Sequence, residues 1–172
     1  MDQPMPLLLR VIHILCGVYW AGALLFVATF LEPSVRASGP DGAKVMQAIM
    51  QRRFLDIMPA VALLTILTGI ELYRRVSGGF DPAWIGTGYG TSITVGAVAA
   101  LVAFTIGVSV LRPAAKRLGP LAQSAQQLPE GAERESRLAE IQRLRQRSAV
   151  AGRLVATLLA VAVVGMGAAR YL

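Results

Sequence analysis

Long uncharged stretches alternate with short polar segments along this sequence. The first stretch runs from residue 11 to residue 31 without a formal charge and, with its flank, covers residues 7–31. Because an α-helix rises about 1.5 Å per residue, this stretch can cross a bilayer core roughly 30 Å thick. Similar stretches cover residues 54–73, 91–111 and 148–169. The pattern predicts an all-α polytopic membrane protein, with residues 1–172 forming a single transmembrane domain built as a four-helix bundle.

Prolines and glycines predict where these helices end. Proline disfavours helical structure at the residue before it, so the first helix is expected to end at Glu32-Pro33. Arg112-Pro113 is expected to mark the end of the third crossing in the hydrocarbon region. The sequence GPDG at residues 39–42 predicts a turn. Residues 43–53 follow with apolar positions on one face and polar positions on the other, which predicts a short helix on the membrane surface.

A polar segment separates the third and fourth stretches. Residues 114–147 combine charges with an apolar stripe formed by Leu138, Ile141 and Leu144 at helical spacing. The segment is predicted to form an antiparallel helical hairpin outside the membrane, with its second arm continuous with the fourth crossing. We expect this hairpin to be cytoplasmic and to offer a docking surface for a protein partner.

Composition and charge support the membrane assignment and add an orientation. Hydrophobic residues make up 55% of the chain and charged residues only 16%, which is too apolar for an ordinary soluble domain. The net charge of +7 does not indicate nucleic acid, because the basic residues cluster beside hydrophobic segments rather than among aromatic ones. Most basic residues flank the first and third connections. The positive-inside rule therefore predicts a multi-pass protein of the bacterial plasma (inner) membrane with both termini outside the cytoplasm. The oligomeric state is not predicted.

The first stretch carries the only histidine of the chain, His13. Arg10, His13, Gly17 and Trp20 fall along one face of the predicted helix. A histidine followed four residues later by glycine allows a flat macrocycle to approach the helix, with an imidazole nitrogen on its iron. Arg10 would neutralise a haem propionate. This face therefore predicts a haem bound through His13, with a redox or redox-assembly role.

Several alternatives stay open at this face. Met166 on the fourth helix is expected at a similar depth and would complete a His/Met axial pair, but five-coordinate iron or a ligand from a partner chain fits equally. His13 and Cys16 also allow a soft copper site. The remaining alternative is that His13 is a buried polar residue bonded to a neighbouring helix, while Gly17 serves close packing. In that case the protein is a non-catalytic accessory or structural subunit without a cofactor.

Ionisable residues near the membrane boundaries are expected to form local pairs. Arg10, Glu71 and Arg74 should lie at similar depth and form a structural ion pair between the first two helices. Asp56 is expected to pair with Arg52 or Arg53. No motif indicates catalytic residues, and the question of enzymatic activity stays open.

Two segments resemble the CopD/HemJ superfamily of small bacterial four-helix membrane proteins. They are RVIHILCGVYWAGALLFVATFLEP at residues 10–33 and QRRFLDIMPAVALLTILTGIELYRR at residues 51–75. The resemblance implies haem b binding through His13, as in the protoporphyrinogen oxidase branch. That branch has an essential lysine at the start of its third helix, where this chain reads YGTSITVGAV, so the resemblance argues against that activity. The copper-import branch has more intramembrane histidines. The overall layout matches an uncharacterised four-helix branch best.

Overall fold

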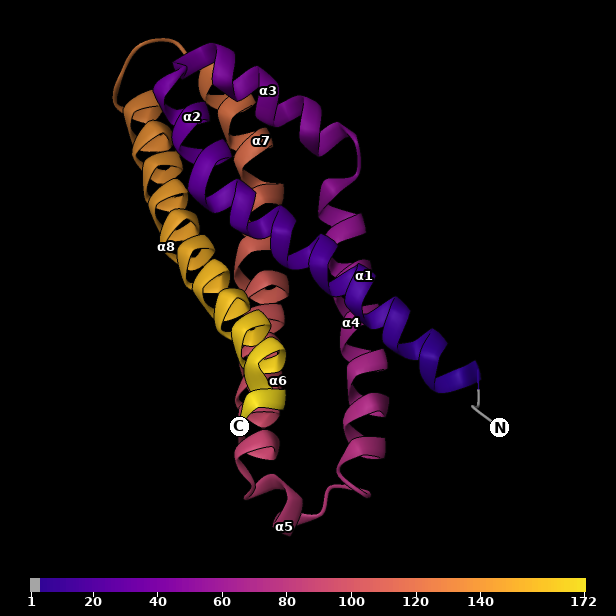
Figure 1. Ribbon diagram of the computed structural model, residues 1–172. Coiled ribbons are helices and arrows are strands. Elements are labelled where there is room, and N and C mark those ends of the chain that lie inside the picture. The colour runs from indigo at the N-terminus through magenta and orange to yellow at the C-terminus, as the bar shows by residue number, and fades with distance from the viewer. Residues whose placement is uncertain (1–3) are drawn as a thin grey trace.

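The computed structural model describes residues 4–172, and the regular structure within that range is entirely helical (Figure 1). Four of its helices are long and apolar enough to cross a membrane: Met5–Ala37, Phe54–Val76, Gly88–Gln127 and Ala132–Tyr171. Large apolar side chains such as Leu15 and Val163 remain exposed along these helices, as expected for surfaces that face lipid. The predicted all-α architecture, with four helices long and apolar enough to span a membrane, is confirmed.

The helices form two antiparallel pairs that lie side by side (Figure 1). The elements are α1 (Pro4–Phe26), η1 (Val27–Leu31), α2 (Glu32–Ala37), α3 (Gly39–Gln51), α4 (Phe54–Val76), α5 (Pro82–Ile85), α6 (Gly88–Ile106), η2 (Gly107–Leu111), α7 (Arg112–Gln127), α8 (Ala132–Ala168) and η3 (Ala169–Tyr171). α1 packs along α4, α6 packs along α8, and α1 also crosses α8 (Figure 1). We call the end with α3 and the α7–α8 connection the hairpin end, and the opposite end the α5 end.

The first helix does not end at Pro33, so this prediction was wrong, and the third helix likewise continues past Pro113. Both continue past Pro33 and Pro113, to Ala37 and Gln127, through one turn of π-helix. A proline ring normally clashes with the carbonyl of the residue four positions earlier. Here the N–H of the residue before each proline donates to a carbonyl five positions back, from Glu32 to Val27 and from Arg112 to Gly107. The wider turn moves the obstructing carbonyl aside and lets the helix continue.

The two π-helical turns belong to a pattern that occurs twice in the chain. The segments LEPSVRASGP at residues 31–40 and LRPAAKRLGP at residues 111–120 share leucine, proline, a basic residue, glycine and proline at the same spacing. A hydroxyl within each turn bonds back to a carbonyl at equivalent positions, Thr29 to Leu25 at 2.7 Å and Ser109 to Thr105 at 2.6 Å. The first helix of each pair, α1 or α6, is therefore followed by the same local structure, which we call the proline turn of each half.

The connections at the hairpin end are more helical than expected. Residues 39–42, predicted as a turn, form the start of α3, and the chain reverses at Ser38 instead. Gly39 adopts a positive φ of 55°, a conformation that glycine reaches without steric cost. The hairpin of α7 and α8 is present, closed by residues 128–131, and its second arm is continuous with the fourth spanning helix as predicted.

Candidate functional site

The face of α1 that carries His13, Gly17 and Trp20 lies against the other helices of the bundle. His13 lies between α1 and α4, where its Nδ1 is 2.9 Å from the backbone carbonyl oxygen of Thr65. Because a carbonyl oxygen only accepts hydrogen bonds, Nδ1 carries the proton and donates to it. The Thr68 hydroxyl lies 3.4 Å from the same nitrogen. The only histidine of the chain therefore bonds two helices together.

A glycine on α4 makes room for this imidazole. A Cβ atom placed on Gly69 would lie 2.8 Å from the Cε1 atom of His13, closer than two carbons approach in proteins. In a regular α-helix the N–H of Gly69 donates to the carbonyl oxygen of Thr65, so this oxygen serves both that N–H and the imidazole. Gly69 and Thr65 thus form a recess one helical turn long that fits the ring. The interaction pairs specific residues on two helices, as small residues and polar contacts commonly do within membranes.

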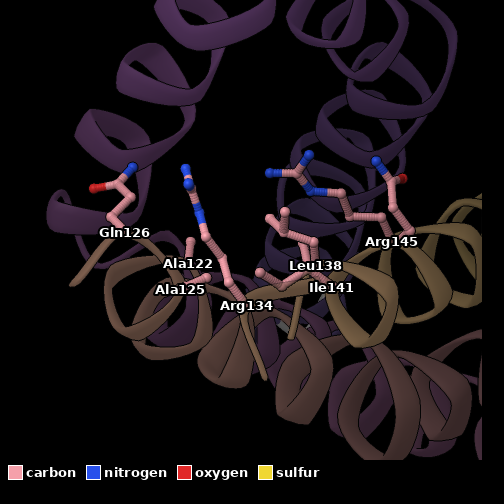
Figure 2. Close-up of a pocket in the computed structure, with 8 residues that line it drawn as sticks. Ala122, Ala125, Gln126, Arg134, Leu138, Ile141 and Arg145 are labelled. Atoms are coloured by element: carbon pink, nitrogen blue, oxygen red, sulfur yellow. The ribbon is translucent and has the colours of Figure 1, made fainter. Parts of the chain in front are cut away.

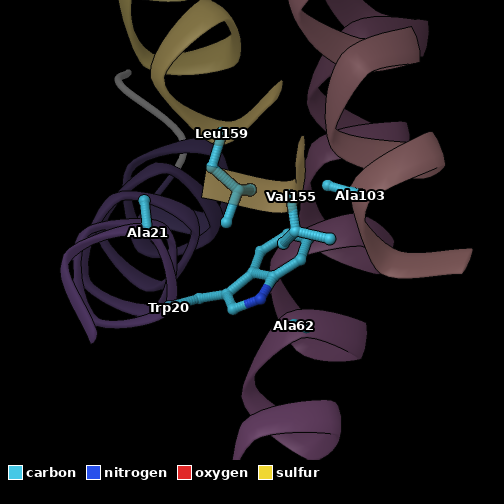
Figure 3. Packing of buried hydrophobic residues seen from close by; sticks show 6 residues of the cluster. All are labelled: Trp20, Ala21, Ala62, Ala103, Val155 and Leu159. Atoms are coloured by element: carbon cyan, nitrogen blue, oxygen red, sulfur yellow. The ribbon is translucent and has the colours of Figure 1, made fainter. Parts of the chain in front are cut away.

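The next turn of the same face is equally occupied. A Cβ atom on Gly17 would lie 3.5 Å from the Cγ2 atom of Thr65, which is ordinary van der Waals contact. Trp20, only 4% exposed, fills the centre of the bundle and meets the ring of Phe104 edge to face at a centroid distance of 6.4 Å. Figure 3 shows its indole reaching from α1 toward residues of the other three spanning helices; the cluster consists of Trp20, Ala21, Ala62, Ala103, Val155 and Leu159.

These contacts decide whether a haem fits beside His13. The predicted position for the macrocycle was the surface of Gly17, and α4 covers that surface at van der Waals distance. Met166, the predicted second ligand, packs in the other helix pair, where its Cγ atom would lie 3.1 Å from a Cβ on Gly96. His13 and Met166 therefore lie in the interfaces of different helix pairs. Among the described residues, these contacts leave His13 bonded to α4 and do not place Met166 beside it.

The second helix pair is held by a contact of the same kind. The Ser92 hydroxyl on α6 donates to the backbone carbonyl of Gly165 on α8 at 2.8 Å. A Cβ atom on Gly165 would lie 3.1 Å from the Ser92 carbonyl oxygen, so this pair is also close at a glycine. In each pair, a polar side chain is hydrogen-bonded to a backbone carbonyl of the facing helix close to a glycine. This similarity indicates a packing role for His13.

The predicted ion pair near the α5 end is present only in part. Glu71 binds Arg74 at 2.8 Å and also Arg75 at 2.6 Å, so the pair lies within α4 rather than between helices. Arg10 is exposed and forms no ion pair with the residues described. The contact from this cluster to α1 is made instead by the Arg75 guanidinium, 3.7 Å from the sulfur of Met5.

The predicted local pairing of Asp56 was wrong, because its partner lies on another helix. The Arg112 guanidinium reaches from the second proline turn to Asp56 Oδ1 at 2.9 Å and to the Leu55 carbonyl oxygen at 3.1 Å. This ion pair links α4 to α7. Sequence spacing favoured neighbours on the same helix, and nothing in the local pattern indicated the third helix.

The copper alternative has too few ligands around it. Cys16 is half-buried on α1, one turn from His13. Across residues 4–172 no group of three or more histidine, cysteine, aspartate or glutamate side chains is placed to hold a metal ion.

Two hollows exist that sequence analysis did not predict. The first has a volume of about 180 Å³ and lies on the hairpin, where Arg134 and Arg145 stand beside Leu138 (Figure 2). The apolar stripe predicted on α8 divides here, because Ile141 is buried against α7 while Leu138 stays 46% exposed. We call this the hairpin hollow; its lining residues are Ala122, Ala125, Gln126, Arg134, Leu138, Ile141, Gln142 and Arg145.

The second hollow lies between the first proline turn and α8. It has a volume of about 440 Å³, and we call it the Arg153 hollow; its lining residues are Ala28, Glu32, Pro33, Arg36, Ala37 and Arg153. The Leu-x-Pro pattern, which occurs at residues 31–33 and 111–113, is the sequence signal that could have indicated this hollow.

No family model, curated protein or solved structure matches the chain.

Proposed function

We propose that this protein is a non-catalytic accessory membrane protein that binds no cofactor and presents its hairpin to a protein partner. The observation that carries the proposal is the occupied face of α1. His13 is bonded to Thr65, Gly17 is covered by α4, and Trp20 is buried at the centre of the bundle. Haem b, copper and the CopD/HemJ resemblance stay predictions, and the geometry favours the packing role over them.

The distribution of basic residues supports an orientation. At the α5 end the basic residues are Arg10, Arg74, Arg75 and Arg170, and the other lysines and arginines belong to the hairpin end or its flanks. Under the positive-inside rule the hairpin end faces the cytoplasm of a bacterial inner membrane and both termini lie outside. The hairpin is then available to cytoplasmic partners.

The absorption spectrum tests the cofactor-free proposal. We expect protein purified from haem-replete cells to show no Soret band and no stoichiometric copper. A His13→Ala variant should give the same spectrum and a lower stability, because it loses the hydrogen bond to Thr65. Such bonds between membrane helices contribute roughly 0.6 to 1.7 kcal/mol. A Soret band that is present in the wild type and lost in His13→Ala would overturn the proposal.

Photo-crosslinking tests the role of the hairpin. The hairpin hollow combines the exposed side chain of Leu138 with the guanidinium of Arg145, while the second guanidinium, that of Arg134, is bound to Glu130 at 3.3 Å. This lining favours a partner segment that is apolar and carries an acid for Arg145. A photoreactive residue at position 138 should give a discrete protein adduct in the host membrane, and Arg145→Glu should lower its yield several-fold.

The matched control places the same photoreactive group at Val163, which is 55% exposed within the fourth spanning helix. This position should react with lipid only. A protein adduct at position 138 that is unchanged by Arg145→Glu would contradict the predicted acidic partner, and the lack of any adduct there would contradict docking at the hollow.

A further inference from the structure

The Arg153 hollow contains an arginine without an acidic partner. Arg153 is exposed on α8 and forms no ion pair within the part of the chain that the structure describes. Across the hollow, Glu32 is bound to Arg36 on its own helix at 2.8 Å, and so does not neutralise Arg153. The three charged side chains that line the hollow therefore carry a net positive charge.

The second proline turn has an ion pair at the position that corresponds to Glu32 in the first. Glu32 and Arg112 hold the same position in the repeated pattern, directly before the proline. Arg112 reaches to α4 and pairs with Asp56 there. In the first half the charges are reversed, with the acid on the turn and Arg153 on the facing helix, but no ion pair forms between them. Of these two equivalent positions, one has an ion pair between helices and the other has none among the described residues.

The depth of the hollow matches the boundary between lipid tails and headgroups. Ala28 belongs to the apolar part of the first spanning helix, whereas Arg36 and Ala37 lie at its end. Arg153 lies directly before the uncharged residues 154–169, and Val150, one turn earlier on α8, is 65% exposed. An arginine within an apolar helix is costly unless its guanidinium reaches an anion or the interface. A phospholipid phosphate is the anion that this depth supplies.

We propose that the Arg153 hollow binds an anionic phospholipid from the leaflet at the hairpin end. The phosphate lies between the guanidinium groups of Arg153 and Arg36, which suit the bidentate geometry of phosphate oxygens. An acyl chain lies against Ala28. An anionic headgroup is favoured over a zwitterionic one, because the latter brings its own cation into a hollow that is already positive.

Lipid binding to the purified full-length chain in detergent tests the proposal, with native mass spectrometry reporting each bound lipid. We expect phosphatidylglycerol to bind more tightly than phosphatidylcholine. Arg153→Gln should weaken phosphatidylglycerol binding about five-fold, since a basic residue near an anionic membrane surface contributes about 1 kcal/mol. Glu32→Gln should strengthen it, because this change removes the one negative charge of the hollow and frees Arg36.

The matched control is Arg143→Gln, which removes one positive charge from an exposed position of α8 outside the hollow. It should leave phosphatidylglycerol binding unchanged. Equal losses in Arg143→Gln and Arg153→Gln would show a diffuse basic surface and overturn the proposal. Equal affinity for the two lipids would also overturn it, as would complete competition by inorganic phosphate, which would indicate a site for a free anion. Because Glu32→Gln is expected to increase binding, impaired folding of one variant cannot imitate the full set of results.

Discussion

Replacing Trp20 by alanine is expected to lower the free energy of unfolding by about 3 kcal/mol. The side chain is 4% exposed and contacts residues from all four spanning helices, so its removal leaves a cavity that no single helix can close. Substitutions of this kind cost about 3 to 5 kcal/mol in water-soluble proteins. We expect the lower end of that range, because lipid tails are as apolar as the protein interior and part of the transfer free energy is absent.

Unfolding of the purified protein by increasing SDS in a mild detergent measures this effect, with circular dichroism as the signal. The matched control is Tyr19→Ala, because Tyr19 precedes Trp20 on the same helix and is 54% exposed. This control should change the free energy of unfolding by less than about 0.5 kcal/mol. Equal losses in the two variants would mean that Trp20 does not join the helices in the way the structure shows.

Replacing Gly69 by leucine is expected to lower the free energy of unfolding by about 1 to 3 kcal/mol, the usual cost of overpacking an interior. The first atom of the new side chain would meet the His13 ring at 2.8 Å, so the imidazole must leave the Thr65 carbonyl or α1 must move away from α4. The same SDS titration measures the loss. Gly22→Leu on α1 is the control, because a Cβ there meets no atom within 4 Å.

The double variant His13→Ala/Gly69→Leu distinguishes this steric explanation from a general loss of helix packing. If the imidazole fills the recess at Gly69, its removal makes space for leucine, and the double variant loses less stability than the two single variants together. Additive losses would show that His13 and Gly69 do not act on each other, which would reopen other roles for His13.

The spanning helices could be predicted from the sequence because their signal is local. Residues 91–111, for example, are uncharged and long enough to cross a membrane whatever the rest of the chain does. The continuation of these helices past Pro33 and Pro113 could not be predicted in the same way. The rule that proline ends a helix assumes α-helical geometry for the residues before it, and the π-helical turns remove that assumption.

The candidate site could be located from the sequence, but the haem interpretation and the packing interpretation of His13 could not be distinguished there. The face with His13, Gly17 and Trp20 is indeed the face that matters on α1, yet its polar group bonds a carbonyl of another helix. The complementary residues, Thr65 and Gly69, are unremarkable on their own and gain meaning only when α4 lies across from His13. Asp56 illustrates the same difficulty, because its partner Arg112 is far away in the sequence and close only in the fold.

The proline turns also set the phase of the two helices that contain them. One extra residue in a helical turn rotates everything beyond it by about 100° relative to an unbroken α-helix. The apolar stripe of the spanning segment and that of the segment beyond the turn are thus out of step, and each can face a different neighbour. α6 lies along α8 within the span, and α7 meets the charged arm of the same helix beyond it. A single long helix thereby serves two environments without a break in its backbone.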